Sequence, residues 1–391
     1  VMRTYWEHHS RFENTQAILL DAEIKKHLFH TRVHHYKDCL EAALYPRKID
    51  AQVYYTLIAA VKENLAPLHR YLGLKARLLD IDRLSYDDIY ASAVPATQKI
   101  FTFDEARSLI IETLKPLGVQ YEKALAEGFK NRWLDIYPNK GKRSGAYSSG
   151  SLYDGHPYIL MNFNGTFGTV TTLAHEIGHA LHSYFSNKAQ PYPTADYPTF
   201  LAEIASTFNE ALLADYLLKT EHDDLIKLFI LDKYIEELRG TLFRQTLFAD
   251  FELAVHREVE KGKTLTPGWL NANYLEITRL YYGHDKGVMD VDRFIENEWS
   301  AIPHFYYNFY VFQYSTGIAA ATTLADMVLN GGETEKNRYL DFLKAGGSDY
   351  PLAVLAKAGV DLTTPAPILA ALKKIGELTE RMEKIILKIP G

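Results

Sequence analysis

Two histidines and a glutamate stand at a spacing that suits metal-assisted hydrolysis. His175 and His179 are four residues apart, and Glu176 follows the first of them. Residues four apart share one face of a helix, so the two imidazoles can bind one metal ion together. Glu176 lies on an adjacent part of that face, within reach of a water molecule on the metal. This His-Glu-x-x-His pattern predicts a zinc site with its own general base.

A third ligand has to come from elsewhere in the chain, because catalytic zinc takes three protein ligands and keeps a fourth position open. Glu203 is the best candidate. It lies in a predicted helix over residues 200–218, after a proline-containing loop over residues 186–198. A carboxylate on an apolar helix face is costly to bury alone, and a metal ion removes that cost. Glu210 shares the face and either orients a ligand histidine or is a surface acid.

The alternative interpretation of these residues needs no metal. In that case His175 and His179 are buried in a core helix, and Glu203 pairs with a lysine or an arginine on a helix surface. The surrounding sequence favours the metal site. The apolar residues after Thr171 and Thr172 continue past His179 with helical spacing. We expect the helix to begin near these threonines, with a threonine capping its first N–H groups.

The rest of the chain predicts a mainly α fold with one small sheet. Residues 134–165 are rich in Gly, Ser, Tyr and Pro, and residues 156–163 favour a strand ahead of the metal-binding helix. Such a strand either binds substrate backbone along its edge or belongs to the core. A soft break lies at residues 91–96. Apolar residues recur with helical spacing in the remaining tracts, which are residues 14–41, 50–72 (with Asp50 as a cap), 103–128, 223–259 and 365–389.

Composition excludes several function classes. The chain has 391 residues, 47% of them hydrophobic, and a net charge of −6, which argues against nucleic acid or an anionic membrane as partner. No stretch approaches the ~18 apolar residues of a membrane span. Cys39 is the single cysteine, so no intramolecular disulfide forms. This suits a reducing compartment, and we expect a cytoplasmic protein in which Cys39 is buried.

An aromatic segment near residue 310 supplies further candidates. His304 is followed by Tyr307, Tyr310 and Tyr314, which would share one face of a helix. A phenol O–H or an imidazole N–H can stabilise the oxyanion that forms when a peptide carbonyl is attacked. The alternative is an aromatic core helix with its hydroxyls at the surface. Spacing alone does not say which tyrosine acts.

Several motifs together make the chain resemble the oligoendopeptidase F branch of the thimet oligopeptidase family of zinc peptidases. The matching segments span most of the chain and are far more specific than the five-residue motif. They are residues 142–147 (KRSGAY), 161–163 (MNF), 172–182 (TLAHEIGHALH), 200–206 (FLAEIAS), 302–310 (IPHFYYNFY) and 345–351 (AGGSDYP).

The resemblance implies a helical fold around a deep channel and the cleavage of short peptides inside it. Carried over by position, His175, His179 and Glu203 would bind one zinc ion, and Glu176 would be the general base. His304 and either Tyr310 or Tyr314 would contact the substrate carbonyl or the oxyanion. Residues 1–95 would line the channel, and residues 96–391 would hold the zinc-site core and the C-terminal helices. The further N-terminal helical region usual in the family is absent from this chain.

Three functions stay open from the sequence. The first is a zinc endopeptidase acting on oligopeptides, by attack of activated water with Glu176 as the base. The second is a zinc carboxypeptidase or dipeptidase. The third is an inactive fragment that binds peptides. Short peptides are the expected partners in each case, and the oligomeric state is left open.

Overall fold

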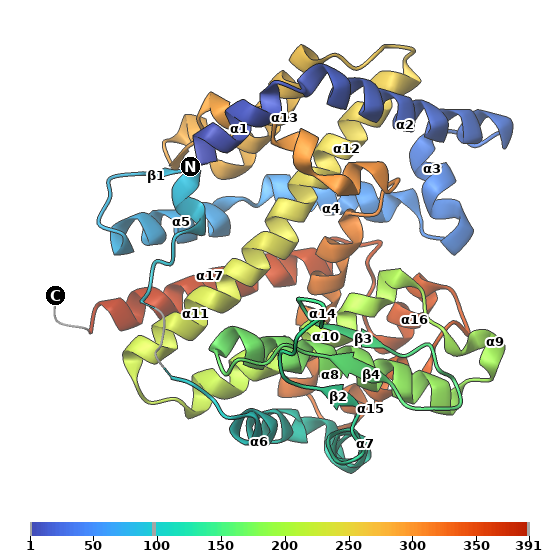
Figure 1. Ribbon diagram of the computed structural model, residues 1–391, viewed down its shortest axis with the longest axis vertical. Coiled ribbons are helices and arrows are strands. Elements are labelled where there is room, and N and C mark those ends of the chain that lie inside the picture. Colours follow the sequence, from blue (N-terminus) through green and yellow to red (C-terminus); the bar gives the residue numbers. More distant parts are fainter. Residues whose placement is uncertain (1, 96–98, 389–391) are drawn as a thin grey trace. The chain divides into compact units, whose positions relative to one another are not determined.

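The computed structural model describes residues 2–95 and 99–388 and is mainly helical (Figure 1). The chain divides into two compact units. Unit 1 comprises Val1–Val94, Ile235–Thr316 and Thr363–Gly391, and unit 2 comprises Pro95–Tyr234 and Gly317–Leu362. The predicted mainly α fold with a small sheet is confirmed. The channel, and the division of roles between residues 1–95 and 96–391, stay predictions.

Unit 1 is built from helices with one two-stranded sheet. In that sheet β1 (Leu84–Ser85) and β5 (Met289–Asp290) pair in parallel. The helices lying wholly in this unit are α1 (Met2–Ser10), α2 (Glu13–Val33), α3 (Cys39–Leu44), α4 (Ala51–Glu63), α5 (Ala66–Leu78), α12 (Gln245–Glu260), α13 (Pro267–Tyr282) and α17 (Ala366–Ile386). Cys39 is buried with a free thiol, as expected.

Two helical tracts predicted in unit 1 are shorter than expected. The tract over residues 14–41 is broken after Val33, where His35 adopts a φ of +60°. The tract over residues 50–72 is interrupted at Asn64, and α5 restarts with a proline in its first turn, where a missing N–H does no harm. The cap at its start is confirmed, since the Asp50 carboxylate accepts from the Gln52 N–H at 2.8 Å.

The tract predicted over residues 223–259 is helical from Asp224 onward, but its hydrogen-bonding pattern changes within it. It consists of α11 (Asp224–Leu238), a π-helical turn over Arg239–Arg244 and α12. Two of the four boundaries between the units fall inside helices, one in α11 and one in α14 (Phe312–Asn330). The C-terminal helix predicted over residues 365–389 runs to Ile386; residue 389, like residue 96 in the soft break, lies outside the described residues.

Unit 2 contains a three-stranded sheet next to the helix that carries the His-Glu-x-x-His pattern. The strand order is β2 (Leu134–Asp135), β4 (Tyr158–Leu160), β3 (Tyr147–Ser149), with β4 parallel to β2 and antiparallel to β3. Strand β3 forms one edge and contacts α8 (Phe167–Ala189). The other helices lying wholly in this unit are α6 (Phe103–Leu114), α7 (Gly118–Lys130), α9 (Tyr192–Ala195), α10 (Thr199–Thr220), α15 (Glu333–Lys344) and α16 (Pro351–Ala358).

Two expectations for unit 2 are corrected. The tract over residues 103–128 is not one helix, because a 3₁₀ turn over Lys115–Leu117 with a proline separates α6 from α7. Helix α8 begins at Phe167, earlier than predicted. The hydroxyls of Thr171 and Thr172 do not cap it, because both donate back to the Gly168 carbonyl inside its first turns at 2.8 Å.

Within the described residues, no helix is both long and apolar enough to cross a membrane.

Candidate metal centre

Helices α8 and α10 meet through their main chains at Gly178. A Cβ at this position would lie 2.5 Å from the Ala205 carbonyl oxygen and 2.6 Å from the Ser206 Cα, closer than real Cβ contacts allow. The Asn209 side chain links the same two helices, because its amide donates a hydrogen bond to the Ala174 carbonyl at 3.1 Å. Glycine at 178 is therefore required for α10 to approach the face of α8 that carries the two histidines.

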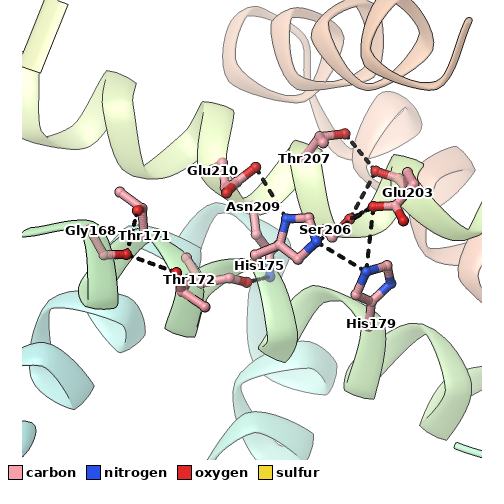
Figure 2. A network of polar contacts seen from close by, with 11 residues as sticks. Gly168, Thr171, Thr172, His175, His179, Glu203, Ser206, Thr207, Asn209 and Glu210 are labelled. Atoms are coloured by element: carbon pink, nitrogen blue, oxygen red, sulfur yellow. Dashed lines mark hydrogen bonds and ion pairs between the residues drawn. The ribbon is translucent and has the colours of Figure 1, made fainter. Parts of the chain in front are cut away.

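The close approach brings the three predicted ligands together (Figure 2). The Nε2 atoms of His175 and His179 are 3.1 Å apart, and each lies 3.5 Å from Glu203 Oε2. Tetrahedral zinc with bonds of ~2.0–2.2 Å places neighbouring ligand atoms roughly 3.3–3.6 Å apart. The two distances to Glu203 fall within this range, and the distance between the imidazole nitrogens lies just below it. The donor types and their spacing therefore fit one small cation, with room for a fourth ligand.

Two of the three ligands, His175 and Glu203, make a further contact that orients them. Glu210 Oε2 lies 3.3 Å from His175 Nδ1, on the side of the ring away from the donor cluster. The Ser206 hydroxyl lies 3.2 Å from Glu203 Oε2, and the Thr207 hydroxyl donates to the Glu203 carbonyl at 2.6 Å. Of the two interpretations of Glu210, this placement favours the one in which it orients a ligand histidine.

The charges around the centre favour a cation. Burial opposes protonation of His175, but its hydrogen bonds to Glu203 and Glu210 outweigh this and raise its pKa well above the ordinary value. Burial likewise acts against the charged form of Glu203, but its contacts with His175 and His179 lower its pKa. A site that stabilises positive charge between carboxylates also attracts a metal ion, which displaces the proton from the imidazole.

Glu176 has the environment of a proton acceptor. It is only 6% exposed, and its Oε2 has no hydrogen-bond partner among the described residues. Burial raises the pKa of Glu176, and the nearby His175 and His179 act in the opposite direction. A carboxylate that is desolvated and unpartnered on a cleft wall can take a proton from a water molecule and give it back.

A cleft of about 860 Å³ opens beside these residues. Its walls come from α8, from the segment that includes β3, from the connection between α8 and α10, and from the first turns of α10. Besides the residues already named, the lining includes Tyr147, Ser149, Tyr153 and Tyr192. The edge strand β3 thus borders the cleft with its Tyr147 side chain exposed. Binding of a peptide backbone along this edge stays a prediction.

The aromatic candidates form a second group, in unit 1. The His304 ring lies 6.1 Å from that of Tyr310 and 5.8 Å from that of Tyr314, and the two tyrosine rings are 5.4 Å apart. The structure therefore brings the three together. The prediction that one helix presents them was wrong. His304 lies in a 3₁₀ turn over Pro303–Tyr306, residues 307–311 are not helical, and only Tyr314 is in α14.

The role of Gly178 was not predicted from the sequence. Its signal was a residue without a side chain in the helical turn between His175 and His179, which marks a close approach of another backbone. Tyr197, which lines the cleft, was not predicted either. Tyr197 stacks on His182 with ring centres 3.7 Å apart and shares a hydrogen bond of 2.8 Å with Ser183. Residue 197 lies in a loop, where spacing carries no signal.

Comparison with known proteins adds independent findings. The sequence model of Peptidase family M3 matches residues 1–374. Oligopeptidase PepF of Bacillus subtilis is 45% identical over 389 residues, which cover 100% of this chain and 57% of that protein. Group B oligopeptidase PepB of Streptococcus agalactiae is 44% identical over 380 residues, covering 97% and 62%.

A solved structure agrees with these matches. The crystal structure of oligoendopeptidase-F from Enterococcus faecium superposes with a TM-score of 0.80 at 36% identity, covering 99% of this chain and 63% of that one. The chain therefore spans about three fifths of the length of the relatives that it matches.

Proposed function

Because the chain belongs to peptidase family M3, we propose that it is a zinc-dependent endopeptidase that hydrolyses short oligopeptides. One observation supports this above the others. His175, His179 and Glu203 present three donor atoms at the spacing of a tetrahedral site, on the wall of a cleft that also holds Glu176. The proposal includes a single zinc ion and a cytoplasmic location.

Two imidazole nitrogens and one carboxylate oxygen are the donors that catalytic zinc takes in proteins. His175, His179 and Glu203 would hold the ion, with Glu210 keeping the His175 ring in place. When bound, zinc supplies a Lewis acid that acidifies water and polarises a carbonyl group.

Glu176 moves the proton. It takes a proton from the attacking water while the water oxygen forms a bond to the peptide carbonyl carbon. It then gives this proton to the peptide nitrogen, so that the C–N bond breaks and an amine and a carboxylic acid result. The proton of the acid passes to the amine, which leaves a carboxylate and an ammonium group. The desolvated position of Glu176 supports this role, because burial raises its pKa toward the pKa values of the groups with which it exchanges protons.

His304 and the phenol of Tyr310 or Tyr314 would donate hydrogen bonds to the carbonyl oxygen as negative charge develops on it. Their mutual ring contacts support a common role. Burial lowers the pKa of His304, which favours a neutral imidazole. A neutral imidazole can still donate through one N–H.

A quenched fluorogenic peptide with both ends blocked tests the proposal. We expect cleavage that a chelator abolishes and that one equivalent of zinc restores. A carboxypeptidase or dipeptidase needs a free end and would leave this peptide intact, while cutting its unblocked counterpart. If zinc binds fully and the peptide binds without being cut, the chain is a peptide-binding fragment and the endopeptidase proposal is wrong.

A further inference from the structure

The aromatic segment contains two consecutive residues in a backbone conformation that side chains disfavour. Asn308 has a φ of +49° and Phe309 a φ of +57°. Asparagine tolerates this left-handed region, but a bulky aromatic residue is rarely found there. Such a conformation persists only where the surrounding structure holds it, and it is common where a functional group has to be aimed.

Phe309 is held through both its ring and its backbone. The buried ring lies 4.2 Å from the His256 ring and meets the Tyr54 ring edge-on at 5.5 Å. The Phe309 N–H donates to Glu252 Oε1 at 2.7 Å. Glu252 and His256 are one turn apart on α12, and the His256 Nδ1 lies 2.8 Å from the Glu252 carbonyl oxygen. One short stretch of α12 therefore holds Asn308 and Phe309, the left-handed pair, in this conformation.

Glu252 is an unusual residue to find at this position. It is completely buried, and among the described residues no lysine, arginine or histidine forms an ion pair with it. Its second carboxyl oxygen has no hydrogen-bond partner there. Burial raises the pKa of Glu252 to about 8, although the Phe309 N–H acts against this. A buried, unpaired carboxyl disfavours folding, so its presence calls for a role other than stability.

We propose that Glu252 is a positioning residue, which sets the direction of the aromatic donors by holding the Phe309 N–H. Phe309 directly precedes Tyr310, and the 3₁₀ turn with His304 lies just before Asn308. The left-handed pair thus decides how the chain leaves that turn and where the Tyr310 phenol points. Glu252 makes no contact with substrate in this scheme. The catalytic part of the inference rests on the function proposed above for His304, Tyr310 and Tyr314.

Hydrogen exchange tests the positioning without any need for activity. In Glu252→Leu the acceptor is lost while the volume is roughly kept, so we expect the amides of residues 304–314 to exchange at least about tenfold faster. Glu252→Gln keeps an acceptor oxygen and should retain the protection of the native protein. Unchanged exchange of residues 304–314 in Glu252→Leu would overturn the proposal.

A second variant covers the case in which Glu252→Leu does not fold. Glu252→Asp keeps the carboxyl group but shortens the side chain by one methylene, so it should also lose the bond to Phe309. The matched control is Glu258→Asp on the same helix, where the carboxylate pairs with Lys263 at 2.7 Å. We expect faster exchange of residues 304–314 in the first variant alone. Equal exchange in both variants would refute a specific role of Glu252.

Kinetics then separate positioning from a merely structural role. With zinc content equal to that of the native protein, Glu252→Asp should lower kcat at least about tenfold and leave KM within about threefold. Glu252→Gln should keep the kcat of the native protein. Faster exchange with unchanged kcat would show that the segment is held but does not aim a donor. If the native chain cuts no peptide, the proposed function fails, and the exchange experiment still decides whether Glu252 holds Phe309.

Discussion

His175 Nδ1 and Glu210 Oε2 face each other at 3.3 Å, on the side of the imidazole opposite the atom that points at Glu203. The carboxylate fixes which nitrogen carries the proton and leaves Nε2 free to bind a metal. We expect Glu210→Ala to weaken zinc binding by roughly 10–100-fold, as removal of such partners does in other metal sites. Competition with a fluorescent zinc chelator measures the affinity.

The matched control for Glu210 is Asp215→Asn on the same helix. Asp215 pairs with the exposed Lys219 at 2.7 Å. This change should leave zinc affinity unaltered. Native affinity in Glu210→Ala would mean that the ring of His175 is held by packing alone and that Glu210 is only a nearby acid.

Glu176→Gln separates metal binding from proton transfer. The amide has the same shape as the acid but cannot accept the proton from water, so we expect kcat to fall by about 10²–10⁴-fold. Zinc content, measured by elemental analysis, should stay at one ion per chain because Glu176 is not among the three clustered donors. Turnover of the blocked peptide at the native rate by this variant would show that another group is the base.

Gly178→Ala should disturb the centre without touching a ligand. The added methyl group would meet the main chain of α10 at 2.5 Å, so the two helices have to move apart. We expect a loss of about 1–3 kcal/mol in the free energy of unfolding, as for other overpacked sites, together with weaker zinc binding. Chemical denaturation and zinc titration measure the two effects.

Gly168→Ala is the control, because the residue belongs to the same helix but no atom lies within 4 Å of the added carbon apart from the adjoining residues and the backbone of the helix itself. It should be neutral or stabilise the protein by up to about 1 kcal/mol, owing to the better helix propensity of alanine. If both variants unfold alike and bind zinc alike, the contact between α8 and α10 does not set the ligand spacing.

The buried Glu252 predicts a pH dependence of stability. Its pKa is raised from an ordinary value near 4.5 to about 8 in the folded protein. The folded chain therefore binds one proton more than the unfolded chain between these values, and stability falls as pH rises through this window. Below pH 4.5 the contribution is fully present. We expect urea unfolding to show native protein losing stability relative to Glu252→Gln from pH 5 to pH 8.

The difference between the two proteins isolates this effect. The neighbouring Tyr54 stays neutral, because burial raises its pKa well above 10. Burial lowers the pKa of His256 to about 3, so His256 makes stability rise with pH up to its unfolded value near 6.5. Both proteins share that contribution, which cancels in the comparison. Parallel stability curves from pH 5 to pH 8 would show that Glu252 is ionised in the folded state.

Single hydroxyl deletions identify the oxyanion donor among the tyrosines. Tyr310→Phe and Tyr314→Phe keep each ring and remove only the O–H. We expect one of them to lower kcat by about 10²–10³-fold, the effect of losing one such donor, with zinc binding unchanged. Tyr307→Phe is the control, since Tyr307 belongs to the same segment but is 56% exposed. Equal activity in all three variants would assign the role to another group.

Residue spacing was sufficient to predict the cluster of His175, His179 and Glu203. The two histidines lie on one helix, and Glu203 lies on the next helix, which packs against the first. It did not predict the breaks in the long helices, since the periodicity of apolar residues continues across Asn64 and Pro116. The helices are interrupted close to Pro67 and at Pro116, because proline has no N–H to donate and its ring clashes with the carbonyl four residues earlier.

The conformation of the segment after His304 could not be predicted from spacing for a different reason. Its aromatic residues recur at helical intervals, but the Phe309 ring is buried between Tyr54 and His256, and its N–H is bound by Glu252. All three partners are distant in sequence, and tertiary contacts override local propensity here. Glu252 itself resembles any polar residue on an amphipathic helix, so only its burial reveals it.

The main-chain contact at Gly178 affects the size of the metal ion that would fit between the three ligands. Peptide groups have no rotamers, so the separation of α8 and α10 cannot adapt as side chains can. A small ion with bonds of ~2.0–2.2 Å matches the donor spacing. Calcium, which needs bonds of about 2.3–2.6 Å and six to eight oxygen atoms, does not. In the proposed zinc site, discrimination between cations by radius would therefore begin at a residue that does not contact the ion.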